Sequence, residues 1–179
     1  MNNNSMIPAK ILQQPKNTIY RSEGRLWQGI PAIERSKKGR LFAAWYSGNN
    51  TEAPDNFVVL EKSEDDGATW TDGWIIIEHE DPFVRCFDQC LWLDPRGRLW
   101  LTWTQSWCEA SGCIFDGRHG VWAVTVNNPD AEDIVFGPIR RIANGVMMNK
   151  PIVIKNGEWL FPCAVWSGVY CEPTQEHPE

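Results

Sequence analysis

Carboxylate, cationic and tryptophan side chains gather in the polar segments between the apolar runs of this 179-residue chain. Glu52 and Asp55 lie in one such segment, 48–55, and carboxylates of this kind can transfer protons in sugar chemistry. Other polar segments offer charges for an acidic group and flat rings for stacking on a sugar: Arg25, Trp27, Gln28, Arg85, Asp88, Gln89, Arg118, Asn149 and Lys150. We therefore predict that Glu52 and Asp55 are catalytic and that the others bind substrate.

Three similar segments determine where these residues must lie. The segments begin at Gly39, Gly97 and Gly157, which are 97 − 39 = 58 and 157 − 97 = 60 residues apart, and each follows a short apolar run. This pattern predicts a strand, a tight turn and a second strand in each unit, and the period leaves room for four strands. The expected strands are 28–34, 40–47, 56–62 and 70–78, then 87–94, 98–106, 119–126 and 135–142, with a third unit from 148.

The octapeptide 63–70, SEDDGATW, reads as a compact corner between two strands of the first unit. The Asp65 carboxylate can accept backbone N–H bonds across the bend, Gly67 can take a positive φ, and Trp70 can pack where the next strand begins. In the second unit, the segment 127–130 is expected to form a plain turn instead.

The octapeptide resembles the Asp-box, or bacterial neuraminidase repeat, of the sialidase (neuraminidase) superfamily. The resemblance implies an all-β, six-bladed sialidase-like β-propeller, of which this chain covers about two and a half blades. We expect a polar lead-in at 1–20 and a partial propeller domain at 21–179, with blade one at 27–78, blade two at 85–142 and blade three from 148. The missing C-terminal blades would be a partner from the same protein. The long loops, and hence the site, would lie at the end opposite the Asp-box.

Sialidases open blade one with an Arg-Ile-Pro triplet, whereas this chain has Gly29-Ile30-Pro31. The arginine that binds the substrate carboxylate is therefore absent from its place. The family takes its acid/base aspartate from the loop that here contains Glu52 and Asp55, and its tyrosine nucleophile from a later blade. The resemblance implies a glycoside hydrolase that removes a terminal, acidic sugar and needs no cofactor. The alternatives are a polysaccharide lyase acting on a uronate and a non-catalytic carbohydrate-binding propeller.

Composition narrows the classes of partner. The formal charge of 17 − 23 = −6 argues against a nucleic-acid partner, and no apolar run reaches transmembrane length. The amino terminus shows no signal peptide, although the family resemblance implies a periplasmic or secreted protein and leaves the cytoplasm open. Among the eleven tryptophans, Trp45, Trp103 and Trp166 are expected at matching places in successive second strands, where they would pack between sheets.

The six cysteines and three histidines do not have the spacing of a metal site. Cys86 and Cys90 are expected on one face of a strand, as core residues too far apart for a disulfide. Cys108 and Cys113 flank a short loop and would form a local disulfide in an oxidising compartment.

Overall fold

The structure, a computed structural model, describes residues 4–109, 112–113 and 118–166 and shows an all-β chain with antiparallel sheets. Sheet 1 has the strand order β1-β5-β4-β3-β2: β1 (Lys10–Gln13), β2 (Trp27–Arg35), β3 (Leu41–Gly48), β4 (Phe57–Ser63) and β5 (Ile75–Glu78). Sheet 2 has the order β10-β9-β7-β6: β6 (Val84–Leu93), β7 (Leu99–Glu109), β9 (Gly120–Val126) and β10 (Arg140–Asn144), with β8 (Gly112–Cys113) paired to β7. A hairpin follows: β11 (Ile152–Val153) and β12 (Trp159–Leu160).

The described residues contain two single-turn 3₁₀ helices, η1 (Asn4–Met6) and η2 (Thr18–Tyr20). No helix among them is long and apolar enough to cross a membrane. The strands therefore build the architecture, and the sheets must bury their apolar faces against each other.

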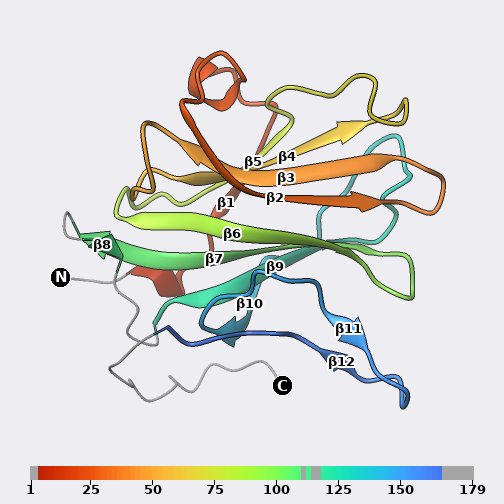
Figure 1. The fold of residues 1–179 in the computed structure, drawn as a ribbon. Coiled ribbons are helices and arrows are strands. Elements are labelled where there is room, and N and C mark those ends of the chain that lie inside the picture. Colours follow the sequence, from red (N-terminus) through yellow and green to blue (C-terminus); the bar gives the residue numbers. More distant parts are fainter. Residues whose placement is uncertain (1–3, 110–111, 114–117, 167–179) are drawn as a thin grey trace.

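The predicted repeat is confirmed in the turns that join the first two strands of each unit. Gly39, Gly97 and Gly157 have φ angles of 105°, 83° and 89°, a left-handed conformation that glycine adopts without steric cost. Each glycine N–H donates to the carbonyl three residues earlier, at 3.1, 2.8 and 2.9 Å. These turns lie at one end of the molecule, and the β3–β4 loop and β8 lie at the other (Figure 1).

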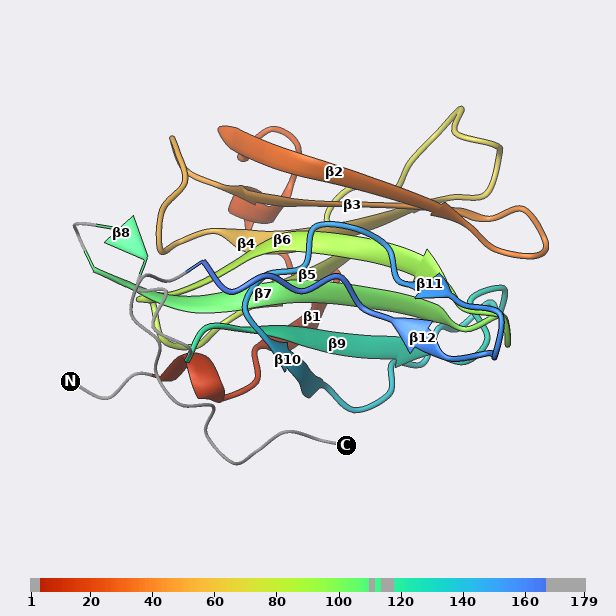
Figure 2. The ribbon, with the colours of Figure 1, turned by 60° about the horizontal axis from the view of Figure 1, so that its bottom comes forward.

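The main core lies between sheets 1 and 2, whose facing side chains interdigitate. Phe42 and Leu60 from sheet 1 and Leu91, Leu101 and Trp103 from sheet 2 are fully or almost fully buried there. Burying a side chain of this size stabilises the fold by roughly 1.5–3 kcal/mol. The two views show the sheets following each other in chain order (Figures 1 and 2).

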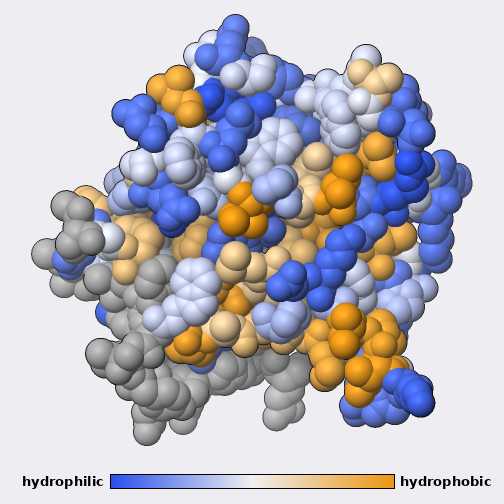
Figure 3. Space-filling view, viewed as in Figure 1, coloured by the Kyte–Doolittle hydropathy of each residue, from blue (hydrophilic) through white to orange (hydrophobic). Residues whose placement is uncertain are grey.

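The β11–β12 hairpin packs on the other face of sheet 2. Trp92 packs edge-on against Trp159 with ring centroids 4.9 Å apart, and Trp100 and Phe161 complete the cluster. Ile152, Val153 and Leu160 of the hairpin are exposed, and apolar groups gather over β11 and β12 (Figure 3). The third unit thus continues the stacking of the first two.

The amino-terminal segment is part of sheet 1, so our description of 1–20 as a polar lead-in was incomplete. β1 pairs antiparallel with β5 and extends the sheet by one strand. Ala9 N–H donates to Gln105 Oε1 at 3.0 Å, and Gln105 Nε2 donates to the Ile7 carbonyl at 2.8 Å. Alternation alone could not reveal this strand, because its four residues are half-buried at most.

Two predicted fourth strands are shorter than expected, for local reasons. β5 begins at Ile75 rather than 70, because the buried Glu61 carboxylate accepts bonds from the backbone N–H groups of Gly73 and Trp74 and holds that segment outside the ladder. β10 spans 140–144 rather than 135–142, since Pro138 lacks the N–H that a strand needs.

The predicted plain turn at 127–130 does more than reverse the chain. Arg40 Nη1 donates to the carbonyls of Pro129 and Ala131, at 2.7 and 2.6 Å, and Asp130 accepts from the Lys38 N–H at 3.3 Å. The turn therefore joins sheet 2 to the β2–β3 turn of sheet 1.

Two expectations about spacing were wrong. Cys86 lies in the core between the sheets, whereas Cys90 lies on the opposite face of sheet 2, because a bulge between them shifts the alternation by one residue. Both thiols are free. Trp103 is fully buried and Trp45 is half-buried, but Trp166 is 48% exposed and lies nine residues after its turn glycine instead of six.

The octapeptide 63–70 forms the compact corner that its residues predict. Asp65 Oδ1 accepts from the Thr69 N–H at 2.8 Å and from Ser63 Oγ at 2.8 Å, and Asp65 Oδ2 accepts from Thr69 Oγ1 at 2.6 Å. Gly67 has φ 90° and its N–H donates to Ser63 Oγ at 2.9 Å. Trp70 stays 39% exposed, so it closes the corner through its bond to the Gly67 carbonyl rather than by burial.

Asp65→Ala is expected to lower the melting temperature, because the hydrogen bonds from Thr69 and Ser63 hold the pKa of Asp65 down at about 2. The folded-state pKa is depressed, so this stabilisation is present above the unfolded value near 3.8 and is lost as pH falls towards 2. Thermal melting at neutral pH and at about pH 3 measures the effect. The exposed Asp133→Ala is the control. An equal drop in both variants, or one independent of pH, would contradict the assignment.

Candidate functional site

The first strands of sheets 1 and 2 each contain a β-bulge at the same place in the repeat. The register shifts between Gly29 and Ala32 in β2 and between Phe87 and Cys90 in β6. Ile30 and Asp88 occupy the bulges with φ of 49° and 46°, and 88 − 30 = 58, the spacing of the turn glycines. Residues with side chains rarely take such angles, and bulges re-aim side chains near functional sites.

A cleft of about 540 Å³, here called the Arg85 cleft, opens where the two bulges meet the third unit. Ile30, Asp88 and Met148 all line it, and Met148 follows Asp88 by 60 residues, the spacing of the second repeat. The other lining residues come from the β3–β4 loop, β6, the β7–β8 hairpin and the end of the third unit: 51–54, Arg85, Phe87, Cys108, Glu109, Gly112, Cys113 and Trp166. The size suits a ligand such as a sugar.

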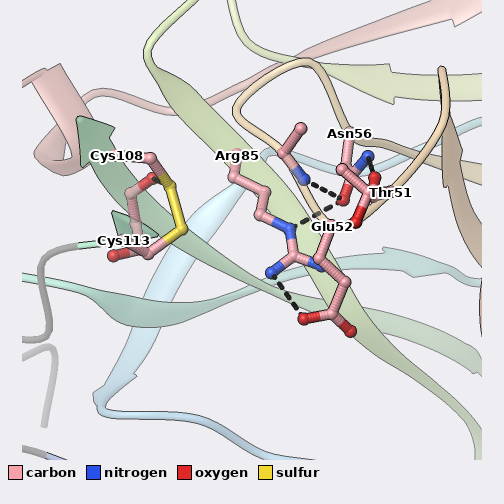
Figure 4. Close-up of a disulfide and its surroundings, with 8 residues drawn as sticks. Thr51, Glu52, Asn56, Arg85, Cys108 and Cys113 are labelled. Carbon is pink, nitrogen blue, oxygen red and sulfur yellow. Dashed lines mark hydrogen bonds and ion pairs between the residues drawn. A yellow bond between two sulfur atoms is a disulfide. The ribbon is translucent and has the colours of Figure 1, made fainter. Parts of the chain in front are cut away.

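Arg85 is the cation of this cleft, and β6 holds it almost fully buried. Its Nε donates to Asn56 Oδ1 at 2.8 Å, and its Nη1 lies 3.6 Å from Glu52 Oε2 (Figure 4). The guanidinium also stacks on the Tyr46 and Phe87 rings, at 4.9 and 4.3 Å from their centroids. Its buried Nη2 has no hydrogen-bond partner among the described residues. Such an arrangement leaves a guanidinium N–H for an anion.

Glu52 lies opposite Arg85 on the β3–β4 loop and is held by two groups. Tyr46 Oη donates to Glu52 Oε1 at 2.6 Å, while Glu52 Oε2 faces the guanidinium. The pKa of Tyr46 is raised, mainly by burial and then by this hydrogen bond, so the phenol keeps its proton. The Glu52 side chain remains 56% exposed and can therefore reach a ligand in the cleft.

Asp88 is the second carboxylate of the cleft and is 6% exposed. Burial raises its pKa to about 6; Arg85 lowers the pKa and Glu52 raises it. No hydrogen bond to its carboxylate occurs among the described residues, in contrast to most buried polar groups.

Asp88→Asn is expected to increase the free energy of unfolding by about 1–3 kcal/mol at neutral pH. The folded-state pKa is raised, so wild type loses stability as pH rises from about 3.8 to about 6, and the neutral amide removes that loss. Asparagine also tolerates the left-handed backbone. Urea unfolding on both sides of this window measures the gap, which should close at low pH. A gap independent of pH would contradict the assignment.

The structure does not bring Asp55 into the Arg85 cleft. Its carboxylate accepts from the Asn49 N–H at 3.3 Å and lines a separate pocket on the other side of the β3–β4 loop. Asp55 is next to Asn56, whose buried side chain binds Thr51 and Ala53 and so fixes the shape of the loop. Asp55 therefore stabilises a loop, and of the two predicted catalytic carboxylates Glu52 alone lines the cleft.

Three predicted binding residues serve the fold instead. The Arg25 side chain is buried, stacks on Trp45 and lies 3.6 Å from Glu61, so its charge is neutralised within the first unit. Gln89 is buried and donates to the carbonyls of Ile30 and Ala44, which joins sheet 2 to sheet 1. Lys150 pairs with Glu34 at 2.7 Å, towards the far end of β2.

Four others also lie outside the lining of the cleft. Trp27 is half-buried against the core between the sheets. Gln28 is exposed on β2 and Asn149 is exposed directly after Met148. Arg118 is exposed, and its carbonyl accepts from Ser5 and Arg141. Proximity to the long loops in the sequence placed these residues in the predicted site, whereas the structure keeps them outside the lining of the cleft.

Tyr46 was absent from the predicted site. The missing side chain at Gly29 was the one signal in the sequence that a large residue fills this space. A Cβ added at Gly29 would lie 2.6 Å from both Cζ and Oη of Tyr46, so the tyrosine ring occupies the space beside the altered triplet. The ring supports Arg85 on one side and Glu52 through its hydroxyl. Tyr46 therefore fills the space that a side chain at position 29 would occupy, and it also holds Arg85 and Glu52 in the cleft.

The Cys108–Cys113 disulfide forms one wall of the cleft, and the prediction of this bridge is confirmed. It closes the β7–β8 hairpin beside Arg85 (Figure 4). Within the described residues no group of three or more His, Cys, Asp or Glu side chains is placed to hold a metal ion.

Comparisons with known proteins leave the family open. No family model and no curated protein matches the chain. A solved protein of unknown function from Dyadobacter fermentans is similar at 17% identity and a TM-score of 0.53, over 83% of this chain and 49% of that one. An arabinanase from Bacillus subtilis is similar at 13% identity and a TM-score of 0.35, over 73% of this chain and 55% of that one. The chain spans about half the length of both structures. The first supports a shared fold, and the second is too distant for a conclusion.

Proposed function

We propose that this chain is part of a six-bladed sialidase-like β-propeller, and that the full protein hydrolyses a terminal, acidic sugar from a glycan in the Arg85 cleft. One observation carries the proposal: equivalent positions of three repeats meet at a cleft that is lined by a guanidinium and two carboxylates. Most glycoside hydrolases use two carboxylates that flank the scissile bond. The hydrogen-bonded corner at 63–70 and the stacking of successive sheets support the propeller.

In this proposal the residues have separate tasks. Arg85 binds the acidic group of the sugar through the guanidinium N–H that lacks a partner. Glu52, oriented by Tyr46, is the catalytic carboxylate next to the anion. Trp166 offers a ring for stacking on a sugar face. Because Gly29 brings no guanidinium, simple sialosides are expected to be poor substrates.

Product analysis with the intact protein tests this function. Methylumbelliferyl glycosides of glucuronic, galacturonic and N-acetylneuraminic acids would be offered beside a neutral glucoside and an acidic polysaccharide. A hydrolase releases a reducing sugar, with acidic glycosides preferred over the neutral one. An unsaturated product absorbing in the near ultraviolet would indicate a lyase instead. Sugar binding without any product would indicate a carbohydrate-binding propeller.

A further inference from the structure

We propose that Asp88 is the group that donates a proton to the leaving oxygen in the Arg85 cleft, an inference that rests on the proposed hydrolysis. Proton donation was expected from the β3–β4 loop, whereas Asp88 comes from the bulge of the second sheet. The geometry, the bonding and the charges around Asp88 each support this role.

The backbone aims Asp88 at the cleft. A left-handed backbone is unfavourable for any residue other than glycine, yet the chain accepts it at the same bulge position in both sheets. In sheet 1 that position is Ile30, which is apolar and also packs against the core between the sheets. In sheet 2 the same backbone presents a carboxylate to the cleft. Of the two bulge positions, 88 is therefore the one with a group that can transfer a proton.

A second buried aspartate near the end of the same strand shows what a structural role looks like. The Asp94 carboxylate accepts from Arg98 N at 2.9 Å, Arg98 Nε at 2.7 Å and Trp100 Nε1 at 3.0 Å, and its pKa is lowered. The Asp88 carboxylate accepts no such bond from the described residues and faces the cleft. Buried acids that serve the fold are bonded in this way, whereas Asp88 is left for a ligand.

The charges around Asp88 suit a proton donor. Arg85 and Glu52 line the same cleft and act on its charge, Glu109 lines the cleft from the end of β7, and β2 and the third unit contribute the uncharged Ile30, Met148 and Trp166. Burial exceeds the effect of Arg85, so the pKa of Asp88 rises to about 6 and a usable fraction stays protonated near neutral pH.

The step balances with water as the second reactant. As the glycosidic C–O bond breaks, its electron pair goes to the leaving oxygen, which takes the proton of Asp88. The oxygen of water forms the new bond to the anomeric carbon, and Glu52 accepts the proton that this water releases. Proton exchange with solvent then restores a neutral Asp88 and an ionised Glu52.

Leaving-group dependence in the intact protein tests this role. Asp88→Asn is expected to lower kcat/KM about 100-fold or more for a methyl glycoside of the best sugar in the panel, and less than about tenfold for its dinitrophenyl glycoside, whose leaving group needs no proton. In wild type, kcat/KM should fall as pH rises through about 6, and the variant should lose this dependence. The exposed Asp133→Asn is the matched control and should behave as wild type.

Three results would overturn the proposal. Equal losses on both glycosides would mean that Asp88 only maintains the cleft. A carboxyl carbon NMR titration of the free protein that places Asp88 at or below its usual range would mean that it carries no proton to donate. Absence of cleavage of any glycoside by wild type would remove the proposed function, and this inference with it, whereas the first two results would leave the proposed function intact.

Discussion

Glu52→Gln is expected to lower kcat on the best acidic glycoside by about 10²–10⁴-fold, the range for loss of a positioned proton-transfer group. The amide keeps the size of the side chain and can still accept from Tyr46, but it cannot take a proton from water or pair with Arg85. Steady-state kinetics with the intact protein would measure the change, and KM should vary less than kcat.

Asp55→Asn is the matched control, because it alters a carboxylate of the same loop that lies outside the cleft. Its kcat should stay within about threefold of wild type, since it perturbs one capping bond. Equal activity of Glu52→Gln and wild type would remove Glu52 from the mechanism. A large loss in Asp55→Asn with unchanged thermal stability would return Asp55 to the site.

Arg85→Met should lower kcat/KM for acidic glycosides by about 10- to 150-fold, because a hydrogen bond to a charged group contributes about 1.5–3 kcal/mol. Methionine keeps the apolar stem that packs beside Tyr46 and Phe87. The loss on a neutral glycoside should be smaller, since that substrate has no anion to bind. Paired kinetics on an acidic and a neutral glycoside of the same leaving group measure the difference.

Arg85→Lys provides the conservative comparison for this prediction. Lysine keeps the charge but lacks the fixed planar N–H donors of the guanidinium, so it should fall between wild type and methionine. Arg118→Met removes an exposed side chain outside the lining of the cleft and should leave the acid preference unchanged. Equal losses on acidic and neutral glycosides in Arg85→Met would mean that Arg85 supports the fold and does not select the substrate.

Much of the sheet order could be predicted because glycine turns and alternating apolar runs are local signals. Gly39, Gly97 and Gly157 set the repeat, and the structure keeps that spacing in turns of the same geometry. The start of β5 could not be predicted, since the Glu61 carboxylate binds the N–H groups of Gly73 and Trp74 only once the chain has folded. The pairing of β1 could not be predicted either, because its partner strand lies more than sixty residues away in the sequence.

The kind of candidate site could be predicted better than the individual residues that belong to it. Glu52, Arg85 and Asp88 line the cleft, as expected of a site built from a long loop and the start of a second repeat. Arg25 and Lys150 were indistinguishable from Arg85 in the sequence, because which acid neutralises a cation depends on packing between distant strands. The bulge at Asp88 could not be predicted either, because one extra residue in a strand reverses the direction of every later side chain and leaves no local sequence signal.

The close approach of Gly29 to Tyr46 has a consequence for how this cleft changes between related sequences. Any side chain at 29 would meet the buried tyrosine ring, whose far end is held by Glu52 and whose face carries Arg85. An arginine at 29 therefore requires the Tyr46 ring to move or position 46 to carry a smaller residue. The two positions should co-vary, with glycine accompanying tyrosine and a longer residue accompanying a small one. Two related proteins that bind the same anion could then carry the binding cation on different strands.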